Sequence, residues 1–378
     1  MHLLHVQVSI RRSFHLLVPF SQKPKLRLDS RLTYDLKGNL CFLYASIEVI
    51  WRTIPEVSKK LKHLLSGEGL SLDTTSVLLK DLSGILEHLE SSKDAKVSLD
   101  DLGARMVECG GQEKGKQQDA HEVLVWIADW MEKLDPKALD FMAMKFEAFS
   151  QCSDEHCLYR GEPNIMIIHE IQIELEQAKG TNIGALLQNT IKQVVKVEEF
   201  ECPAKDSGCA SGEACSALKT KLKESTDDAE KKQYELELKK CTGTRTESYQ
   251  GNPSVVVVHL KRWVVDFVRV KKISRTVDLE VQKVQKMWGE HYVLMGVLRR
   301  SGTGPLEGHW DALTRDEVRA DSDWHEYTEG RVYQIPQRSI SENAAVLVFR
   351  KVDAAVAKEF GKTDRYGRSS RSRRARKG

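Results

Sequence analysis

Hydrophobic positions recur with two different periods along this chain, one in its first third and one in the remainder. Over 58–65, 76–86 and 120–131, apolar residues stand three and four positions apart, which places them on one face of an α-helix. From Phe146 onward the pattern changes, and apolar and polar residues alternate in the second half of 165–175, as in a half-buried β-strand. Further apolar runs predict strands at 254–260, 291–298 and 345–349. The chain is therefore predicted to be an α+β protein, with a helical lobe followed by a sheet-rich lobe.

Composition limits the class of protein further. A chain of 378 residues is long enough for one large domain or two ordinary ones. Charged residues make up 30% of the chain and nearly cancel, to a net charge of +3, which is typical of a globular protein and not of a disordered chain or a strong polyanion binder. No apolar run approaches the roughly 20 residues that a membrane span requires, so we expect no membrane association.

The distribution of charge separates a central domain, residues 33–352, from two basic ends. The first 28 residues contain five basic side chains and no acid, so residues 1–32 are interpreted as a flexible leader, with a transit peptide as the alternative. Residues 353–378 are interpreted as a disordered basic tail, because after Asp364 arginines alternate with serines and no acid follows. The domain is expected to be helical over about 33–140 and to hold its strands over about 141–352. Within the latter part, the charged segment 216–241 predicts an exposed helix or hairpin insertion.

Two residues have the chemistry of a nucleophile and its base. Cys41 stands at the front of a helix-like apolar run, and far downstream His309 follows a glycine. The amides at a helix N-terminus and an adjacent imidazole both favour the thiolate, which is the nucleophilic form of cysteine. This layout is typical of a papain-like cysteine hydrolase. Because the two residues fall on different lobes, we expect the active site in the cleft between them.

Four short motifs, in the same order, resemble those of the ubiquitin-specific proteases, the papain-like class of deubiquitinating enzymes. The motifs are GNLCFL at 38–43, QQDAHE at 117–122, HLKRW at 259–263, and SG at 301–302 followed by GHW at 308–310. The resemblance extends over roughly 34–351. It implies a papain-like fold with a helical thumb, a β-sheet palm and β fingers, and it implies ubiquitin and ubiquitinated proteins as partners. Whether the modifier is ubiquitin or a ubiquitin-like protein stays open.

The resemblance also implies roles for individual residues. Cys41 would attack the carbonyl after the C-terminal glycine of ubiquitin and form a thioester, and His309 would act as the base and then as the acid. Gln117 and Asp119 match positions that contact the ubiquitin tail, where Asp119 can pair with an arginine. Trp310 would wall the channel for this tail, with core packing as the competing interpretation. Catalysis of this kind needs no cofactor, and the expected location is cytoplasmic or nuclear.

Two positions depart from the family pattern. Leu36 stands where the family has the asparagine that donates to the oxyanion, which leaves the backbone amide of Cys41 and the side chain of Asn39 as candidate donors. Thr328 falls on the position that orients the histidine. Its hydroxyl can accept a hydrogen bond from histidine Nδ1, but it carries no charge to stabilise imidazolium. Glu329, one residue further on, is the alternative source of that charge.

These departures keep two other functions open. One is a catalytically impaired ubiquitin binder with the same fold. The other, from a different class, is association with nucleic acid through the arginine-rich tail, which would depend steeply on salt.

Six of the eight cysteines lie in the middle of the chain, between positions 152 and 241. In the family, two closely spaced cysteine pairs in the fingers hold a structural zinc ion. Here Cys152 and Cys157 match the first pair, and Cys202 with Cys209 or Cys215 matches the second, at wider spacings. A zinc site, with Cys152, Cys157, Cys202 and Cys209 as the ligands, and a group of buried free thiols are both consistent with the sequence.

Overall fold

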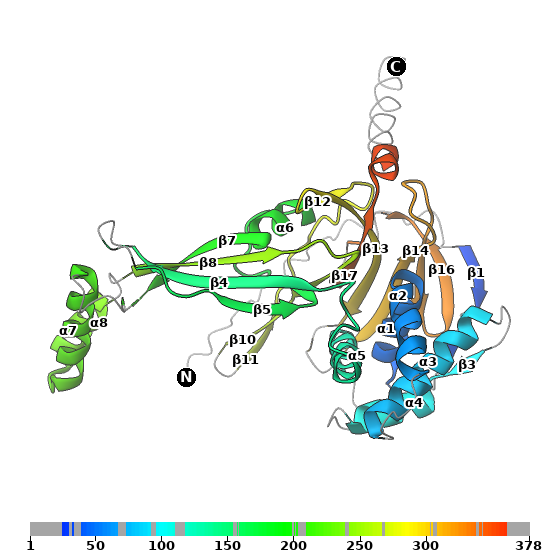
Figure 1. Ribbon diagram of the computed structural model, residues 1–378, viewed down its shortest axis with the longest axis horizontal. Coiled ribbons are helices and arrows are strands. Elements are labelled where there is room, and N and C mark those ends of the chain that lie inside the picture. The colour runs from blue at the N-terminus through cyan, green and yellow to red at the C-terminus, as the bar shows by residue number, and fades with distance from the viewer. Residues whose placement is uncertain are drawn as a thin grey trace, which may run out of the picture.

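The computed structural model of the chain has three parts, a helical thumb, a palm sheet and extended fingers (Figure 1). It describes residues 25–29, 32–33, 39–66, 73–91, 96–109, 118–153, 157, 159–198, 200, 202, 209–238, 242–266, 269–302, 304, 308–337, 340–341 and 343–360. The predicted α+β organisation is confirmed, with the helices gathered early in the chain and most strands later.

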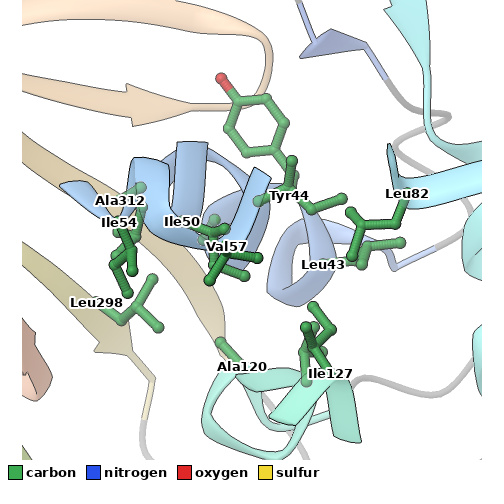
Figure 2. Close-up of a cluster of buried hydrophobic side chains, with 14 of the residues drawn as sticks. Leu43, Tyr44, Ile50, Ile54, Val57, Leu82, Ala120, Ile127, Leu298 and Ala312 are labelled. Carbon is green, nitrogen blue, oxygen red and sulfur yellow. The ribbon is translucent and has the colours of Figure 1, made fainter. Parts of the chain in front are cut away.

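The thumb is built around one buried helix. Its helices are α1 (Cys41–Thr53), α2 (Pro55–Leu65), α3 (Thr74–Ser91), α4 (Asp100–Cys109) and α5 (Ala120–Leu134). The short strands β2 (Leu32–Thr33) and β3 (Val97–Ser98) pair in parallel beside them. Nearly all of α1 is buried, because it contacts α2 and α5 on one side and the palm strands on the other. Figure 2 shows side chains of this shared core, including Leu82 of α3, Ile127 of α5 and Leu298 of the palm.

The palm is a large, mainly antiparallel sheet with the strand order β1-β16-β15-β14-β13-β17-β9-β6, and β12 also pairs with β13. The strands are β1 (Lys25–Asp29), β6 (Glu170–Glu174), β9 (Val255–Lys261), β12 (Gln285–Met287), β13 (Glu290–Ser301), β14 (His309–Arg315), β15 (Trp324–Thr328), β16 (Arg331–Ile335) and β17 (Ala344–Val352). Only β6 and β9 pair in parallel among them. The apolar run at 254–260 is confirmed as a buried inner strand, since β9 lies between β17 and β6.

The fingers extend away from the thumb as a narrower antiparallel sheet (Figure 1). Its order is β5-β4-β8-β7, from the strands β4 (Met144–Cys152), β5 (Asn164–Ile168), β7 (Lys192–Glu198) and β8 (Thr242–Gln250). Helix α6 (Ile183–Ile191) packs where the fingers meet the palm, and β10 (Trp263–Asp266) forms a hairpin with β11 (Arg269–Lys272). At the far end stand α7 (Ala210–Glu224) and α8 (Asp228–Leu238). These two helices cover most of the charged insertion expected at 216–241.

Both ends of the chain differ from the expectation. The leader expected at 1–32 contains β1, which pairs with β16 at the edge of the palm sheet. The disordered tail expected from 353 begins instead with a helix at 354–360, whose first turn is capped by Asp353 Oδ1 at 2.9 Å and 2.8 Å from two backbone N–H groups. Phe360 is buried against the palm, which explains why this helix is ordered. Residues 1–24 and 361–378, with the arginine-rich run, lie outside the described residues.

Among the residues that the structure describes, no helix is both long and apolar enough to cross a membrane.

Candidate active site

The first helix of the thumb presents Cys41 at its N-terminus. Cys41 is the first residue of α1, is 6% exposed, and follows Leu40, whose side chain gives the helix no cap. The first backbone N–H groups of a helix have no partner inside the helix, so they and the helix dipole favour a negative charge on the cysteine. Asn39, the predicted oxyanion donor, is exposed and adopts a left-handed conformation with φ of 53°, which asparagine tolerates well. The loop at 34–38, with Leu36, lies outside the described residues.

His309 is presented by the palm, at the first position of β14. The preceding Gly308 has a φ of +139°, and a Cβ there would collide with the backbone oxygen of Ser301 on β13. Only glycine therefore allows β14 to start so close to β13. Because α1 packs directly on β14, the side chains of Cys41 and His309 come into hydrogen-bonding contact. The two residues that the sequence predicts as nucleophile and base are thus brought together.

The other side of the His309 ring faces two acceptors. Nε2 lies 2.8 Å from Thr328 Oγ1 and 3.2 Å from Asp311 Oδ1. The sequence interpretation assigned this contact to Nδ1, and the structure corrects it to Nε2. Nδ1 is therefore the ring nitrogen that remains for Cys41. This division of the two nitrogens fixes the orientation of the ring.

His309 is held in its charged form. The hydrogen bond to Asp311, followed by the hydrogen bond to Cys41, outweighs burial and raises the pKa of His309 to about 10. At neutral pH the ring is then an imidazolium, which stabilises a neighbouring thiolate. A histidine in contact with a cysteine is the arrangement that nucleophilic catalysis by a thiol requires.

Asp311 is the functional residue that sequence reasoning missed. Its side chain is 7% exposed, and burial raises its pKa while the hydrogen bond with His309 and the charge of Arg299 lower it, with a lowered pKa as the net result. The signal was present in the sequence, because residues two apart on a strand point to the same face. Glu329, kept as the alternative source of charge, is exposed in the turn between β15 and β16 with a φ of 48°. The carboxylate that the structure places against His309 is that of Asp311.

A pocket between the thumb, the palm and the β10–β11 hairpin includes Trp310, which follows His309 on β14. Its lining residues are Asp119, His259, Leu260, Arg262, Trp263, Lys272, Arg300, Trp310 and Ala345. Of the predicted tail-binding residues, Asp119 and Trp310 reach this pocket, whereas Gln117 lies outside the described residues. Trp310 also packs in the core, where it is 1% exposed and its Nε1 donates to the carbonyl of Gln118 at 3.1 Å. Both interpretations of Trp310, channel wall and core residue, therefore fit its position.

Asp119 and Arg300 give the pocket opposite charges. Asp119 caps α5, since its Oδ1 accepts from the backbone N–H of His121 at 2.9 Å. Arg300 lies with its guanidinium 5.2 Å from the ring centroid of Trp263 and 5.5 Å from that of Trp310. Burial lowers the pKa of Arg300, while the charges of Asp119 and Cys41 oppose this effect. Arg300, which was not among the residues predicted for the site, thus places a cation within electrostatic reach of Cys41.

A second group of chemically active residues lies at the tip of the fingers. The sulfurs of Cys152, Cys157, Cys202 and Cys209 all lie within 4.8 Å of one another, with 3.7 Å between Cys152 and Cys209 and 3.5 Å between Cys157 and Cys202. Four sulfurs at about 2.3 Å from one tetrahedral zinc ion lie about 3.8 Å apart, so the set fits zinc. Cys209 also accepts a backbone hydrogen bond from Gly212 at 3.3 Å, in the first turn of α7. Cys215 is disulfide-bonded, which leaves Cys209 as the fourth candidate ligand.

A histidine pair with a carboxylate lies where α5 meets the palm. His121 Nε2 lies 2.5 Å from Glu170, and the rings of His121 and His259 stack with their centroids 3.7 Å apart. The ligand atoms of His121, Glu170 and His259 lie within 4.8 Å of one another, but stacked rings hold their nitrogen lone pairs in separate planes, which disfavours binding of one metal ion by both rings. Burial lowers the pKa of His259 to about 3, whereas for His121 the hydrogen bond to Glu170 outweighs burial and raises the pKa. The group therefore acts as a charged contact with Glu170 that ties α5 to β6 and β9.

Comparison with known proteins gives one family match and one curated relative, both described as hydrolases. The family described as "Ubiquitin carboxyl-terminal hydrolase" matches residues 35–349. A curated relative, ubiquitin carboxyl-terminal hydrolase 2 of Gallus gallus, is 28% identical over 113 residues, which are 28% of this chain and 31% of the relative. The aligned part thus spans about a third of that relative's length.

Solved structures share the fold. The SAGA Ubp8/Sgf11/Sus1/Sgf73 DUB module bound to ubiquitin aldehyde superposes with a TM-score of 0.61 at 15% identity, over 86% of this chain and 70% of that chain. The same kind of module bound to monoubiquitin gives a TM-score of 0.58 at 14% identity, over 89% of this chain and 73% of that chain. The predicted papain-like fold with thumb, palm and fingers is confirmed.

Proposed function

This chain belongs to the ubiquitin carboxyl-terminal hydrolase family, and we propose that it is a deubiquitinating thiol protease that cleaves the isopeptide or peptide bond after the C-terminal glycine of ubiquitin. The observation that carries the proposal is the contact between Cys41 at the start of α1 and a charged His309 at the start of β14. A thiol at one ring nitrogen and a carboxylate at the other is the arrangement expected for a catalytic histidine, and a structural histidine does not require it.

The proposed reaction follows from these positions. The Cys41 thiolate attacks the carbonyl carbon, and the electron pair moves onto the carbonyl oxygen, where backbone N–H groups at the start of α1 and the side chain of Asn39 are the candidate donors. His309 then gives its Nδ1 proton to the leaving lysine amine as the C–N bond breaks, and a thioester remains on Cys41. Neutral His309 then takes a proton from water as the water oxygen attacks the thioester carbonyl. The C–S bond breaks, which restores the Cys41 thiolate beside protonated His309, and ubiquitin leaves as a carboxylic acid that loses its proton to solvent.

The pocket beside the pair is the proposed site for the ubiquitin tail. It is lined by Trp310 and Asp119, and by Arg300, which interacts electrostatically with Cys41. Asp119 supplies a carboxylate for an arginine of the tail, and the aromatic side chains of Trp263 and Trp310 confine the narrow chain of the terminal glycines. Gln117 stays a proposed contact.

Turnover of ubiquitin amides tests the proposal. We expect the full chain to release a fluorophore from the C-terminus of ubiquitin, at a rate well above that of a control in which Cys41 is replaced. Parallel substrates made from ubiquitin-like modifiers identify the modifier. Measurable affinity for ubiquitin without turnover would instead select the catalytically impaired binder. A protein that neither binds nor hydrolyses any of these modifiers would contradict the proposal.

We further propose that Cys152, Cys157, Cys202 and Cys209 hold one structural zinc ion at the tip of the fingers. The ion would tie β4 and the start of α7 together, where the free thiols alone offer only weak contacts. The cysteine cluster is far from Cys41 in the sequence and takes no part in the proposed reaction, so zinc would stabilise the fold and supply no step of catalysis.

Removal of one ligand is expected to release this metal. The purified protein should contain one zinc per chain, and Cys202→Ser should lose it and unfold at a lower temperature, because the three remaining thiolates bind zinc more weakly. Metal analysis by mass spectrometry and a thermal melt measure both effects. Cys109→Ser is the matched control, since Cys109 is an exposed cysteine on α4, outside the cluster. Wild-type protein without zinc, purified in the absence of chelators, would contradict the site.

The location of the protein stays a proposal. Of the seven described cysteines, Cys215 is disulfide-bonded and the other six form no disulfide, and this majority fits a reducing compartment. This supports the cytoplasm or the nucleus, where we expect ubiquitinated proteins to be its partners.

A further inference from the structure

We propose that two residues share the role of supporting the catalytic histidine. The Thr328 hydroxyl orients the His309 ring, and the Asp311 carboxylate stabilises the positive charge on it. The inference rests on the proposed function of Cys41 and His309. Asp311 is a positioning residue in this arrangement, because it acts on the reaction only through His309.

The pairing of β14 and β15 explains why these side chains meet. Ala312 pairs with Tyr327 in the antiparallel register, so the next pair outward consists of Asp311 and Thr328. Side chains two apart on β14 share a face, so His309 lies beside this pair. The Thr328 hydroxyl lies 2.8 Å from His309 Nε2 and also hydrogen-bonds to Asp311. A hydroxyl can accept from the imidazolium and donate its own proton to the carboxylate.

The carboxylate of Asp311 is held from its other side. On β13, Arg299 pairs directly with Asp311, and its Nη2 and Nε donate to Oδ2 at 3.0 Å and 3.3 Å. Oδ1 is then the oxygen that faces His309, at 3.2 Å. Arg299 also bonds Glu326 on β15, so one guanidinium anchors two carboxylates. The Asp311 carboxylate is therefore fixed in two directions, and a side chain 7% exposed leaves it little contact with water.

The Asp311 carboxylate can stabilise a positive charge on His309, which the hydroxyl of Thr328 cannot do. The hydroxyl of Thr328 accepts a hydrogen bond but leaves the positive charge of His309 without compensation. The buried carboxylate stabilises that charge, and its hydrogen bond is the largest contribution that raises the pKa of His309. The arrangement thus explains how the chain holds a charged histidine with threonine at the orienting position.

The competing explanation is that Asp311 only neutralises Arg299. Several charged groups face His309 or its partners, namely Cys41 on α1, Arg299 and Arg300 on β13, and Glu326 on β15. Loss of a purely structural carboxylate would lower activity equally at all pH values. Loss of the carboxylate that charges His309 would change the pH at which the imidazolium disappears.

The pH profile of Asp311→Asn separates the two explanations. Asparagine keeps an acceptor for Arg299 but removes the charge, so the pKa of His309 should fall by about 1–3 units and the alkaline limb of kcat/KM should move to lower pH by that amount. We expect kcat/KM at neutral pH to fall about 10-fold to 100-fold, less than for loss of the histidine because Thr328 still fixes the ring. Asp311→Ser, a second variant without the charge, should give the same displacement.

Rescue and control variants complete the test. Asp311→Asn combined with Thr328→Asp places the carboxylate at the oxygen position nearest Nε2 and should restore the alkaline limb. Asp316→Asn is the matched control, because Asp316 forms another aspartate–histidine contact, 2.8 Å from His325, away from Cys41. This control should leave the profile unchanged. An unshifted alkaline limb in both Asp311 variants, or a larger shift in Thr328→Val, would overturn the inference.

An NMR titration of the His309 ring gives a readout that needs no turnover. The pKa measured in wild type should fall in Asp311→Asn. If wild type shows no Cys41-dependent activity, the proposed function fails, yet the titration still decides the role of Asp311. If wild type is active and the titration is unchanged in the variant, only the inference about Asp311 fails.

Discussion

Replacing Cys41 by alanine is expected to reduce the turnover of ubiquitin amides by about 10⁴-fold or more. A thioester requires a thiol, and among the described residues Cys41 is the thiol that contacts His309. The change removes only a sulfur from a side chain at the first turn of α1, so the fold and the tail pocket should persist. Steady-state hydrolysis, a thermal melt and the affinity for ubiquitin measure the three quantities.

The matched control for this variant is Cys109→Ala, which removes an exposed thiol from α4. It should retain the full rate. Residual activity of Cys41→Ala above a tenth of the wild-type rate would show that another residue performs the chemistry. A large loss of ubiquitin affinity with Cys41→Ala would mean that the tail pocket depends on the thiol.

Replacing His309 by alanine is expected to reduce kcat/KM by about 10²-fold to 10⁴-fold, the range of a general acid and base. In wild type the imidazolium is present below its pKa of about 10 and is lost above it, so activity should fall as the pH rises through that value. In the variant this alkaline limb should vanish, because the group that causes it is gone. A pH series of kcat/KM for both proteins measures the difference.

The same histidine links stability to pH. Because the folded-state pKa of His309 is raised from 6.5 to about 10, its stabilising contribution is complete below 6.5 and is lost as the pH rises through about 10. His63→Ala, at an exposed histidine of α2, is the control and should change neither profile. An alkaline limb that persists in His309→Ala would show that another group causes it.

Local sequence patterns were sufficient to predict the α+β frame of the molecule and that Cys41 and His309 would meet. Cys41 could be assigned because a thiol stood before a long apolar helical run, and His309 because a glycine preceded it where β14 begins. The apolar run that became β9 was recognisable as a buried inner strand, since both of its faces are covered. In each case one short segment holds the whole signal.

Contacts across strands could not be predicted in the same way. Asp311 reads as one polar residue in a strand, and its role depends on the register that sets it opposite Thr328 on one side and Arg299 on the other. Register comes from the packing of the entire sheet, which a single segment does not reveal. The choice between Cys209 and Cys215 was open for the same reason, because it depends on where α7 starts relative to β4. Strand β1 and the helix that ends at Phe360 were not predicted for a similar reason, because both are held by palm surfaces built from distant parts of the chain.

The most direct test of the account is the reaction of the full chain with ubiquitin that carries an electrophile in place of its C-terminal glycine. The account predicts one covalent adduct per chain, located at Cys41 by peptide mass mapping, formed at neutral pH and absent in Cys41→Ala. Failure of the folded wild-type protein to react with this probe, or an adduct located at any other cysteine, would contradict the assignment of Cys41 as the nucleophile of a deubiquitinase.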